Sequence, residues 1–406
     1  MDKIKKAMTR GVDNIYPNAQ ALEKKLKSGE KIRLYCGYDP TASTLHIGHA
    51  ITLRKMAHFQ DLGHQVIMLI GDFTGMIGDP TDKKETRQKL TRKQVLENAK
   101  NYQKLASKIL KFTGENPAKI MYNSEWNDKL TFKDLIELSS NFTVQQMLVR
   151  DMFQERIKKE KPIYLHEFLY PLAQSYDSVA MDVDLEIGGT DQTFNMLCGR
   201  DLMKTIKNKE KLVLTIKLLV DSSGKKMGKT EGNMVALDEK PEQMYGQIMA
   251  WSDELIVPGL ELCTDISIEE IDDIKNGIKE EKINPRDAKA RLAKEIVLIH
   301  HSKEEAEKAE EEVNRVFKDK QEPLEIPICK LDSKKYNVLD LLVKTKLVPS
   351  KSEAKRLIEQ GAVRINDKKI DDWQEIIDFR GKIKKGDRKG FVIIQVGKKK
   401  FIKIKI

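Results

Sequence analysis

Two short stretches of this 406-residue chain combine residue types that suit phosphate chemistry. In the first, His46 and His49 flank Gly48 just after an apolar run, where a helix is expected to begin. A helix N-terminus offers free N–H groups and a positive dipole end, and a glycine lets a phosphate approach the backbone. In the second, Lys226 and Lys229 lie on either side of a glycine, and a lysine ammonium is a compact donor for developing phosphate charge. Taken alone, surface histidines and a solvated lysine turn would explain either stretch.

A third set of polar residues has the spacing of one helix face. Tyr170, Gln174 and Asp177 are four and three residues apart, so in a helix they point the same way. Pro171 favours the first turn of that helix. An exposed polar stripe would explain these residues in isolation, whereas beside a nucleotide-binding fold they predict a pocket for an amino acid.

Alternating apolar and amphipathic segments must position these residues. Strands are predicted at 31–37, 65–71, 119–122, 184–189 and 212–217, and helices at 45–62 and 92–112. This alternation predicts an α/β fold with a Rossmann-like, doubly wound parallel sheet. The segment 144–159 is interpreted as part of a helical insertion in that fold. Residues 188–192, Gly-Gly-Thr-Asp-Gln, follow a strand at its carboxyl end, where ligands of such sheets bind.

The charge of the chain is concentrated at its C-terminal end. Residues 336–406 hold 19 Lys and Arg against 9 Asp and Glu, which accounts for the whole net charge of +10. A basic end on a neutral body predicts a polyanionic partner. We expect a nucleotide-binding α/β domain at 1–235, an α-helical domain at 236–320, a linker at 321–335 and a small, basic α+β module at 336–406.

The remaining composition excludes several classes of protein. No apolar run approaches the roughly 20 residues of a membrane span, and the polar N-terminus does not have the pattern of a signal peptide. The four cysteines, Cys36, Cys198, Cys263 and Cys329, form neither CxxC pairs nor clusters with histidine. They predict reduced thiols in the cytoplasm and no protein metal site.

Together the motifs resemble those of class I aminoacyl-tRNA synthetases. His46-Ile47-Gly48-His49 matches the HIGH signature, and residues 225–230, Lys-Lys-Met-Gly-Lys-Thr, resemble KMSKS with Gly228 and Thr230 in place of its two serines. Residues 35–41, Tyr-Cys-Gly-Tyr-Asp-Pro-Thr, are similar to the YCGFDPT stretch of bacterial tyrosyl-tRNA synthetases. Residues 352–366 resemble an RNA-binding module that bacterial members share with a ribosomal small-subunit protein. The likeness spans essentially the whole chain, with the motifs in the family's order.

The resemblance implies a tyrosine–tRNA ligase. Such an enzyme activates L-tyrosine with ATP to tyrosyl-adenylate and pyrophosphate, then transfers tyrosine to the 3′-terminal adenosine of tRNA(Tyr). ATP enters as a substrate that carries its own Mg²⁺. The family also implies a homodimer built through the helical insertion around 144–159, a cytoplasmic location and no contact with a membrane.

The resemblance further assigns site residues. Phosphate chemistry is assigned to Thr41, His46, His49, Lys83, Arg87, Lys226, Lys229 and Thr230. Tyrosine binding is assigned to Tyr35, Thr74, Asp79, Tyr170, Gln174, Asp177 and Gln192. ATP and adenylate contacts are assigned to Cys36, Gly37, Asp39, Gly48, Gly189 and Asp191, although burial of a small residue explains Cys36 equally well. Contacts to tRNA are assigned to Lys351, Lys355, Arg356 and Arg364.

The same resemblance gives a physical account of specificity. Tyr35 and Asp177 match the pair that binds the phenolic hydroxyl, and we expect Asp177 to be left buried and unpaired when that hydroxyl is missing. A site of this kind rejects phenylalanine by ~10⁴–10⁵ without editing. The alternatives are a tryptophanyl ligase, a short nucleotidyltransferase with an HxGH motif, and an inactive synthetase-like RNA-binding protein. The basic end module and the Tyr35/Asp177 pair argue against the first, chain length against the second, and the intact motifs against the third.

Overall fold

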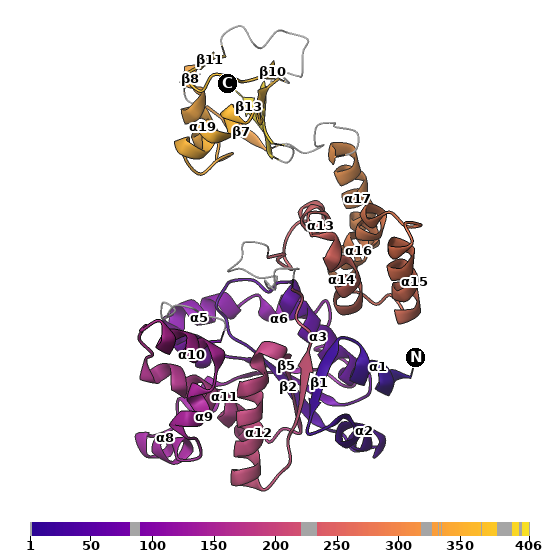
Figure 1. Cartoon of the computed structure of the whole chain (residues 1–406), viewed down its shortest axis with the longest axis vertical. Coiled ribbons are helices and arrows are strands. Elements are labelled where there is room, and N and C mark those ends of the chain that lie inside the picture. The colour runs from indigo at the N-terminus through magenta and orange to yellow at the C-terminus, as the bar shows by residue number, and fades with distance from the viewer. Residues whose placement is uncertain are drawn as a thin grey trace. The chain divides into compact units, whose positions relative to one another are not determined.

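The structure is a computed structural model of the chain, and it forms two compact units, residues 1–306 and 307–406. Figure 1 shows both units with their helices and strands labelled. The residues described are 2–81, 90–220, 234–317, 327–331, 333, 335–366, 368–379, 392–397 and 400–405.

A six-stranded sheet organises the first unit. Its strands are β1 (Val12–Tyr16), β2 (Arg33–Tyr38), β3 (Gln65–Ile70), β4 (Lys119–Tyr122), β5 (Leu185–Gly189) and β6 (Leu212–Ile216). They lie in the order β1-β6-β5-β2-β3-β4, and only β1 runs antiparallel to its neighbour. The predicted α/β class and the five predicted strands are confirmed. The edge strand β1 was not predicted, because a single residue of it, Ile15, is buried and it shows no alternation.

The chain changes direction across the sheet between β2 and β5. It places β3 and β4 on one side of β2, and later places β5 and β6 on the other side. Right-handed crossovers therefore put α3 (Ile47–Gln60), which links β2 to β3, and α12 (Thr193–Lys207), which links β5 to β6, on opposite faces, as Figure 1 shows. Such a switch point leaves a crevice beyond the carboxyl ends of β2 and β5.

Further helices complete this part of the first unit. They are α1 (Lys3–Thr9), α2 (Ala19–Lys27), α4 (Thr74–Ile77), α5 (Arg92–Ala99), α6 (Tyr102–Ala106), α7 (Ser124–Asn127), α8 (Phe132–Ser139), α9 (Val144–Leu148), α10 (Asp151–Lys158) and the long α11 (Leu165–Met181). The predicted helix 92–112 is in fact α5 and α6, which separate at Lys100 and Asn101.

The predicted helical segment 144–159 consists of α9 and α10, which Arg150 separates with an extended backbone. One further prediction about a helix was wrong. Pro171 is the seventh residue of α11 and not part of its first turn. A proline there removes one backbone hydrogen bond, at a cost of about 3 kcal/mol. The packing of α11 against α12, in which Val179 shares a buried cluster with Leu202 and Met203, offsets that cost.

Helices follow the sheet in the rest of the first unit. These are α13 (Pro241–Met249), α14 (Ile256–Cys263), α15 (Ile268–Lys279), α16 (Pro285–His300) and α17 (Lys303–Phe317), which crosses into the second unit. Helix α16 is central, since its buried face of Leu292, Ala293, Ile296 and Val297 packs against α13 and α14. No helix of the described residues is long and apolar enough to cross a membrane.

One arginine ties the N-terminal segment to this helical part. The Arg10 guanidinium donates to the carbonyl oxygens of Leu260 (3.0 Å), Glu261 (2.9 Å), Thr264 (2.8 Å) and Ile266 (2.6 Å). These carbonyls lie at and just after the end of α14, where backbone oxygens have no partner within the helix. Arg10 therefore acts as a C-terminal cap supplied from a distant part of the chain.

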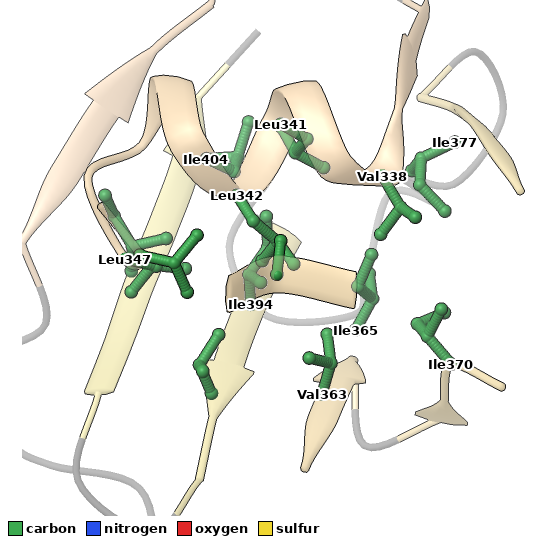
Figure 2. Packing of buried hydrophobic residues seen from close by; sticks show 14 of the residues in the cluster. Val338, Leu341, Leu342, Leu347, Val363, Ile365, Ile370, Ile377, Ile394 and Ile404 are labelled. Atoms are coloured by element: carbon green, nitrogen blue, oxygen red, sulfur yellow. The ribbon is translucent and has the colours of Figure 1, made fainter. Parts of the chain in front are cut away.

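The second unit has its own sheet and core. Its elements are β7 (Ile328–Lys330), β8 (Lys335–Asn337), α18 (Val338–Lys344), α19 (Lys351–Glu359), β9 (Val363–Ile365), β10 (Lys368–Lys369), β11 (Ile376–Asp378), β12 (Val392–Val396) and β13 (Lys400–Lys405). Five strands form a sheet in the order β10-β9-β12-β13-β7, and β8 pairs with β11. Figure 2 shows Leu341 and Leu342 of α18 packed with Ile365, Ile394 and Ile404 of this sheet.

The predicted linker 321–335 overlaps this sheet. Strand β7 lies inside it and pairs in parallel with β13, with Ile328 opposite Lys403. A prediction from proline content missed the strand, because it is only three residues long and its sole inward residue, Cys329, is half-buried. At least residues 328–330 therefore belong to the folded second unit.

Candidate active site

A cavity of about 910 Å³ lies where the carboxyl ends of β2 and β5 meet the start of α3 and one face of α11. The residues predicted for ATP and tyrosine that fall within the described chain all line it. They are Tyr35, Cys36, Gly37, Asp39, Thr41, His46, Gly48, His49, Thr74, Asp79, Tyr170, Gln174, Asp177, Gly189, Asp191 and Gln192. The others, Lys83, Arg87, Lys226, Lys229 and Thr230, lie outside the described residues.

The two histidines cap the N-terminus of α3. His46 Nδ1 accepts from the N–H of Gly48 at 3.1 Å, and His49 Nδ1 accepts from the N–H of His46 at 3.1 Å. Their rings stack with centroids 3.8 Å apart. Because each Nδ1 is an acceptor, a neutral ring carries its proton on Nε2. Burial lowers the pKa of His46 to about 4 and the pKa of His49 well below its usual value, so both rings are neutral Nε2–H donors at pH 7.

The chain that follows the lysine-rich stretch is anchored beside these histidines. The N–H of Ile47 donates to the carbonyl of Val235 at 2.9 Å, and the N–H of Leu237 donates to the carbonyl of Leu45 at 2.8 Å. His46 also pairs with Ala236 in a β-bridge. The segment that follows the lysine-rich stretch in sequence is therefore fixed next to the start of α3.

A carboxylate at the end of β2 organises the middle of the cavity. Asp39 accepts from the Thr74 hydroxyl at 2.6 Å and from the Tyr170 hydroxyl at 2.8 Å. Both donors were predicted to bind tyrosine, whereas Asp39 was assigned to the adenylate, so the structure joins the two groups. Gly71 makes this approach possible, because a Cβ there would collide with the Asp39 carboxylate and the Thr74 hydroxyl.

A second carboxylate, Asp79, is held from two sides. Gln192 Nε2 donates to it at 2.7 Å, and the backbone N–H and hydroxyl of Thr81 donate at 2.8 and 2.6 Å. Arg150, at the break between α9 and α10, donates in turn to the Thr81 hydroxyl at 2.5 Å. Sequence reasoning missed Arg150, which reaches the cavity wall from the helical insertion.

Asp177 differs from the expectation. It is 2% exposed, yet its carboxylate accepts from Trp126 Nε1 at 2.7 Å, Asn127 Nδ2 at 3.0 Å and Asn123 Nδ2 at 3.2 Å. The expectation that Asp177 is left unpaired without a phenol is therefore wrong. Burial raises the pKa of Asp177 to about 8, and the three donors oppose that rise. Trp126 and Asn127 lie on α7, and Asn123 lies just before it, after β4. The sequence there has no apolar pattern that would have predicted these partners.

Tyr35 joins a buried hydrogen-bond network that the sequence did not reveal. Its hydroxyl lies 2.9 Å from Ser178 Oγ, to which Lys211 Nζ donates at 2.8 Å. The Lys211 ammonium also forms an ion pair with Glu186, and Glu186 accepts from Gln174 Nε2 at 3.0 Å. A glutamate inside the apolar strand 184–189 was the available signal, because an ionised side chain there requires a partner.

The residues predicted to contact ATP and the adenylate surround the carboxyl ends of β2 and β5. A Cβ added at Gly37 would meet nothing within 4 Å, so this glycine opens onto free cavity space. Burial raises the pKa of the Cys36 thiol to about 12, which keeps it protonated and excludes it as a nucleophile. Burial raises the pKa of Asp191 to about 6, with Asp79 contributing in the same direction.

The four residues predicted to contact tRNA lie on α19 and β9 of the second unit, and all are exposed. Lys351 pairs with Asp340 at 2.5 Å and Arg356 with Glu353 at 2.6 Å, while the Lys355 ammonium stands 4.3 Å from the centroid of the Trp373 ring. Lys351 and Lys355, one helical turn apart, share a face of α19. Within the described chain there is no group of three His, Cys, Asp or Glu side chains that would hold a metal ion.

Comparison with known proteins finds family models that match almost the whole chain. The family described as tRNA synthetases class I (W and Y) matches residues 27–318, and the Tyrosine--tRNA ligase SYY-like C-terminal domain matches residues 318–404. The chain is 44% identical to the tyrosine–tRNA ligase of Thermotoga maritima over 98% of this chain and 96% of that one. It is 43% identical to tyrosine–tRNA ligase 2 of Clostridium acetobutylicum over 100% and 98%.

A likeness in three dimensions agrees. The structure of a C-terminally truncated mitochondrial tyrosyl-tRNA synthetase from Aspergillus nidulans superposes with a TM-score of 0.66 at 22% identity, over 78% of this chain and 94% of that one. At this identity the likeness concerns the fold alone.

Proposed function

Since this chain belongs to the class I tRNA synthetases, in their bacterial tyrosine–tRNA ligase group, we propose that the cavity at β2 and β5 is where tyrosine meets ATP. The enzyme activates L-tyrosine with ATP and transfers the tyrosyl group to tRNA(Tyr). The assignment of the site rests on one observation. A single cavity is lined both by the neutral histidines at the start of α3, which suit a phosphate, and by the buried polar residues of α11.

The end of the cavity beside α3 is assigned to ATP. His46 and His49 present Nε2–H donors at the N-terminus of α3. A helix N-terminus favours an anionic ligand, and the two neutral rings add hydrogen-bond donors to it without adding a positive charge. Thr41 contributes its hydroxyl at the same mouth. Lys83, Arg87, Lys226, Lys229 and Thr230 are proposed to neutralise the pyrophosphate as it leaves. Mg²⁺ arrives bound to the triphosphate, since it favours phosphate oxygens and water over a protein cage.

The deep end of the cavity is assigned to tyrosine. Its ammonium group needs acceptors, which Asp79, Gln174 and the Tyr170 hydroxyl supply. Gln192 donates to Asp79, and Thr74 lines the same end and donates to Asp39, which also accepts from Tyr170. Tyr35 and Asp177 face its phenol. Cys36, Gly37, Asp39, Gly48, Gly189 and Asp191 are assigned to the adenylate, which bridges the two ends. The tyrosine carboxylate attacks the α-phosphate, and no protein nucleophile takes part.

The remaining parts of the chain are assigned to tRNA. Residues 1–235 carry out catalysis, 236–320 form the α-helical domain on the anticodon side, and 336–406 bind tRNA through Lys351, Lys355, Arg356 and Arg364. All of the net charge lies in the last segment, and phosphate contacts dominate affinity for nucleic acids. The enzyme is assigned to the cytoplasm, where tRNA is charged.

The enzyme is proposed to work as a homodimer that pairs through the helical insertion. Seven of the fourteen exposed large apolar side chains of the described residues fall between Phe132 and Leu165: Phe132, Ile136, Val144, Val149, Ile157, Tyr164 and Leu165. Such a concentration marks an interaction surface. Sedimentation at decreasing protein concentration tests the pairing, and an active monomer would contradict it.

A single assay tests the assignment of the substrate. Tyrosine should drive exchange of pyrophosphate into ATP, whereas tryptophan and phenylalanine should do so at least about 10³-fold less well at equal concentration. His46→Ala should abolish most of the exchange, while the unfolding free energy should fall only by the loss of one helix cap, about 1 kcal/mol. Exchange driven equally by tryptophan would refute the tyrosine assignment, and normal exchange by the His46 variant would refute the placement of the site.

A further inference from the structure

The loop between β2 and α3, residues 39–45, carries Thr41 into the wall of the cavity. Its backbone forms few hydrogen bonds of its own. Among the described residues, the one backbone–backbone hydrogen bond made by residues 40–44 runs from the N–H of Thr41 to the carbonyl of Asp39, at 2.7 Å. Backbone polar groups that leave water need partners, so side chains from elsewhere must hold this loop in place.

Two side chains from a neighbouring part of the chain supply such partners. Asn98, near the end of α5, donates from Nδ2 to the carbonyl of Pro40 at 2.9 Å. Tyr102, at the start of α6, donates from its hydroxyl to the carbonyl of Ala42 at 2.9 Å. A carbonyl oxygen only accepts, so the direction of both hydrogen bonds is fixed, and the two carbonyls lie on either side of Thr41. Burial raises the pKa of Tyr102, so the hydroxyl keeps the proton that it donates.

These donors stand on a closely packed support. Tyr102 is 1% exposed, and Val95, about one turn before Asn98 on α5, is 0% exposed. A Cβ added at Gly75 of α4 would stand 3.3 Å from Pro40 Cδ and 3.5 Å from Val95 Cγ1, so α4, α5 and the loop pack closely at this point. A proline has no N–H, so at Pro40 only the carbonyl can hold the backbone, and this is the group that Asn98 bonds.

On the basis of the function proposed above, we propose that Asn98 and Tyr102 are positioning residues for the adenylation step. They fix the backbone on both sides of Thr41, so that its hydroxyl meets the ATP phosphates without a rearrangement of the loop. A donor that is already in place stabilises a transition state, whereas a misplacement of about 1 Å costs up to about 100-fold in rate. Tyr102 also lines the cavity, but its hydroxyl proton is committed to the carbonyl of Ala42. Both residues therefore act on the reaction through Thr41.

The test is a double-mutant cycle in the full-length enzyme, in which the single-turnover rate of tyrosyl-adenylate formation is measured. Tyr102→Phe removes one hydroxyl and keeps the ring, and Asn98→Ala removes the amide. Each is made in the native enzyme and in a Thr41→Ala enzyme. Gln60→Ala is the matched control, because the Gln60 amide also donates to two backbone carbonyls, at 2.6 and 2.9 Å, but lies outside the cavity lining. Melting temperatures are measured for every variant.

The single variants should lose rate and not affinity for tyrosine. Tyr102→Phe and Asn98→Ala should each lower the adenylation rate about threefold to tenfold, the effect of one neutral hydrogen bond, with KM for tyrosine within about twofold. The Thr41→Ala enzyme has lost the hydroxyl that they position. In that enzyme each should lower the rate less than about twofold, because the effects of residues that act through one group do not add. Gln60→Ala should keep the native rate, even though it lowers the melting temperature.

The outcomes separate this inference from the proposed function. A rate loss that is as large in the Thr41→Ala enzyme as in the native one would overturn the inference, since the two residues would then act independently of Thr41. Native rates in both single variants would overturn it as well, and if one variant fails to fold, the other decides. An unchanged rate in Thr41→Ala would refute the assignment of Thr41 and the inference with it. A native enzyme without any tyrosine-dependent exchange of pyrophosphate into ATP would instead refute the proposed function itself.

Discussion

Replacing Asp177 by asparagine tests the pocket most sharply, because the contacts allow the cost to be worked out. The carboxylate accepts from Trp126 and Asn127 on Oδ1 and from Asn123 on Oδ2. An asparagine that keeps its oxygen at the Oδ1 position turns its NH₂ group toward the Asn123 amide. One buried donor then loses its acceptor, which costs about 1–3 kcal/mol of unfolding free energy.

The same substitution weakens the contact to the substrate. A hydrogen bond from the phenolic hydroxyl to an ionised carboxylate contributes about 1.5–3 kcal/mol, so kcat/KM for tyrosine should fall roughly 10- to 150-fold. Phenylalanine does not make this bond, and its kcat/KM should change little. Burial raises the pKa of Asp177 to about 8, so the assay is run about one pH unit above that value, where the carboxylate is ionised.

Asp72→Asn provides the control. Asp72 is 2% exposed and accepts from the N–H and the hydroxyl of Ser124, at 2.9 and 2.8 Å, but it does not line the cavity. Because this variant also loses the 3.4 Å ion pair between Asp72 and Arg92, it should lose at least as much stability while keeping the native preference for tyrosine. If Asp177→Asn and Asp72→Asn gave the same tyrosine-to-phenylalanine ratio, Asp177 would serve only to anchor α7, and our account of specificity would fail.

Four other expectations follow from the same contacts. Tyr35→Phe should lower discrimination against phenylalanine about threefold to tenfold with unchanged KM for ATP; equal losses for both amino acids in exchange assays would contradict it. His46→Ala should lower the single-turnover rate of adenylation at least about 100-fold with little change in tyrosine affinity, and a pure binding defect would argue against a transition-state role. Because burial raises the pKa of Asp177 to about 8, its contribution to stability is present below pH 4 and lost as the pH rises to 8; denaturant titrations should show the native enzyme losing stability relative to Asp177→Asn over that window. Ending the chain after Phe317 should leave pyrophosphate exchange intact but abolish charging of tRNA and flatten the salt dependence of tRNA binding; normal charging by the shortened enzyme would refute the role of the second unit.

The sequence predicted the parts of the fold that carry strong periodic signals. Strands β2, β3, β5 and β6 are nearly continuous apolar runs, as expected for a sheet covered on both faces, and their alternation with helices indicated the doubly wound class. Edge strand β1 and the three-residue β7 gave no comparable signal, because each buries a single side chain at most and owes its pairing to a distant strand.

The site was predictable where its residues follow strand ends or share a helix face. Asp39 comes directly after β2, Gly189 ends β5 and His46 caps the helix that follows β2, while Tyr170, Gln174 and Asp177 share one face of α11. The polar partners behind the pocket were not predictable, since Ser178, Lys211 and Trp126 meet only in three dimensions. Sequence spacing identifies the side chains that line the cavity but not the donors and acceptors that orient them.

The position of β1 and Arg10 has a consequence for how the chain folds during synthesis. Strand β1 pairs with β6, 201 residues later in the chain, and the carbonyls that Arg10 caps begin 250 residues after it. A ribosome adds about 5–20 residues per second, so the first segment to emerge waits roughly 10–50 s for its partners. Helix α1 can dock early on α3, where Lys55 donates to the carbonyls of Ala7 and Arg10, but β1 and the Arg10 guanidinium complete their contacts only after β6 and α14 have been synthesised.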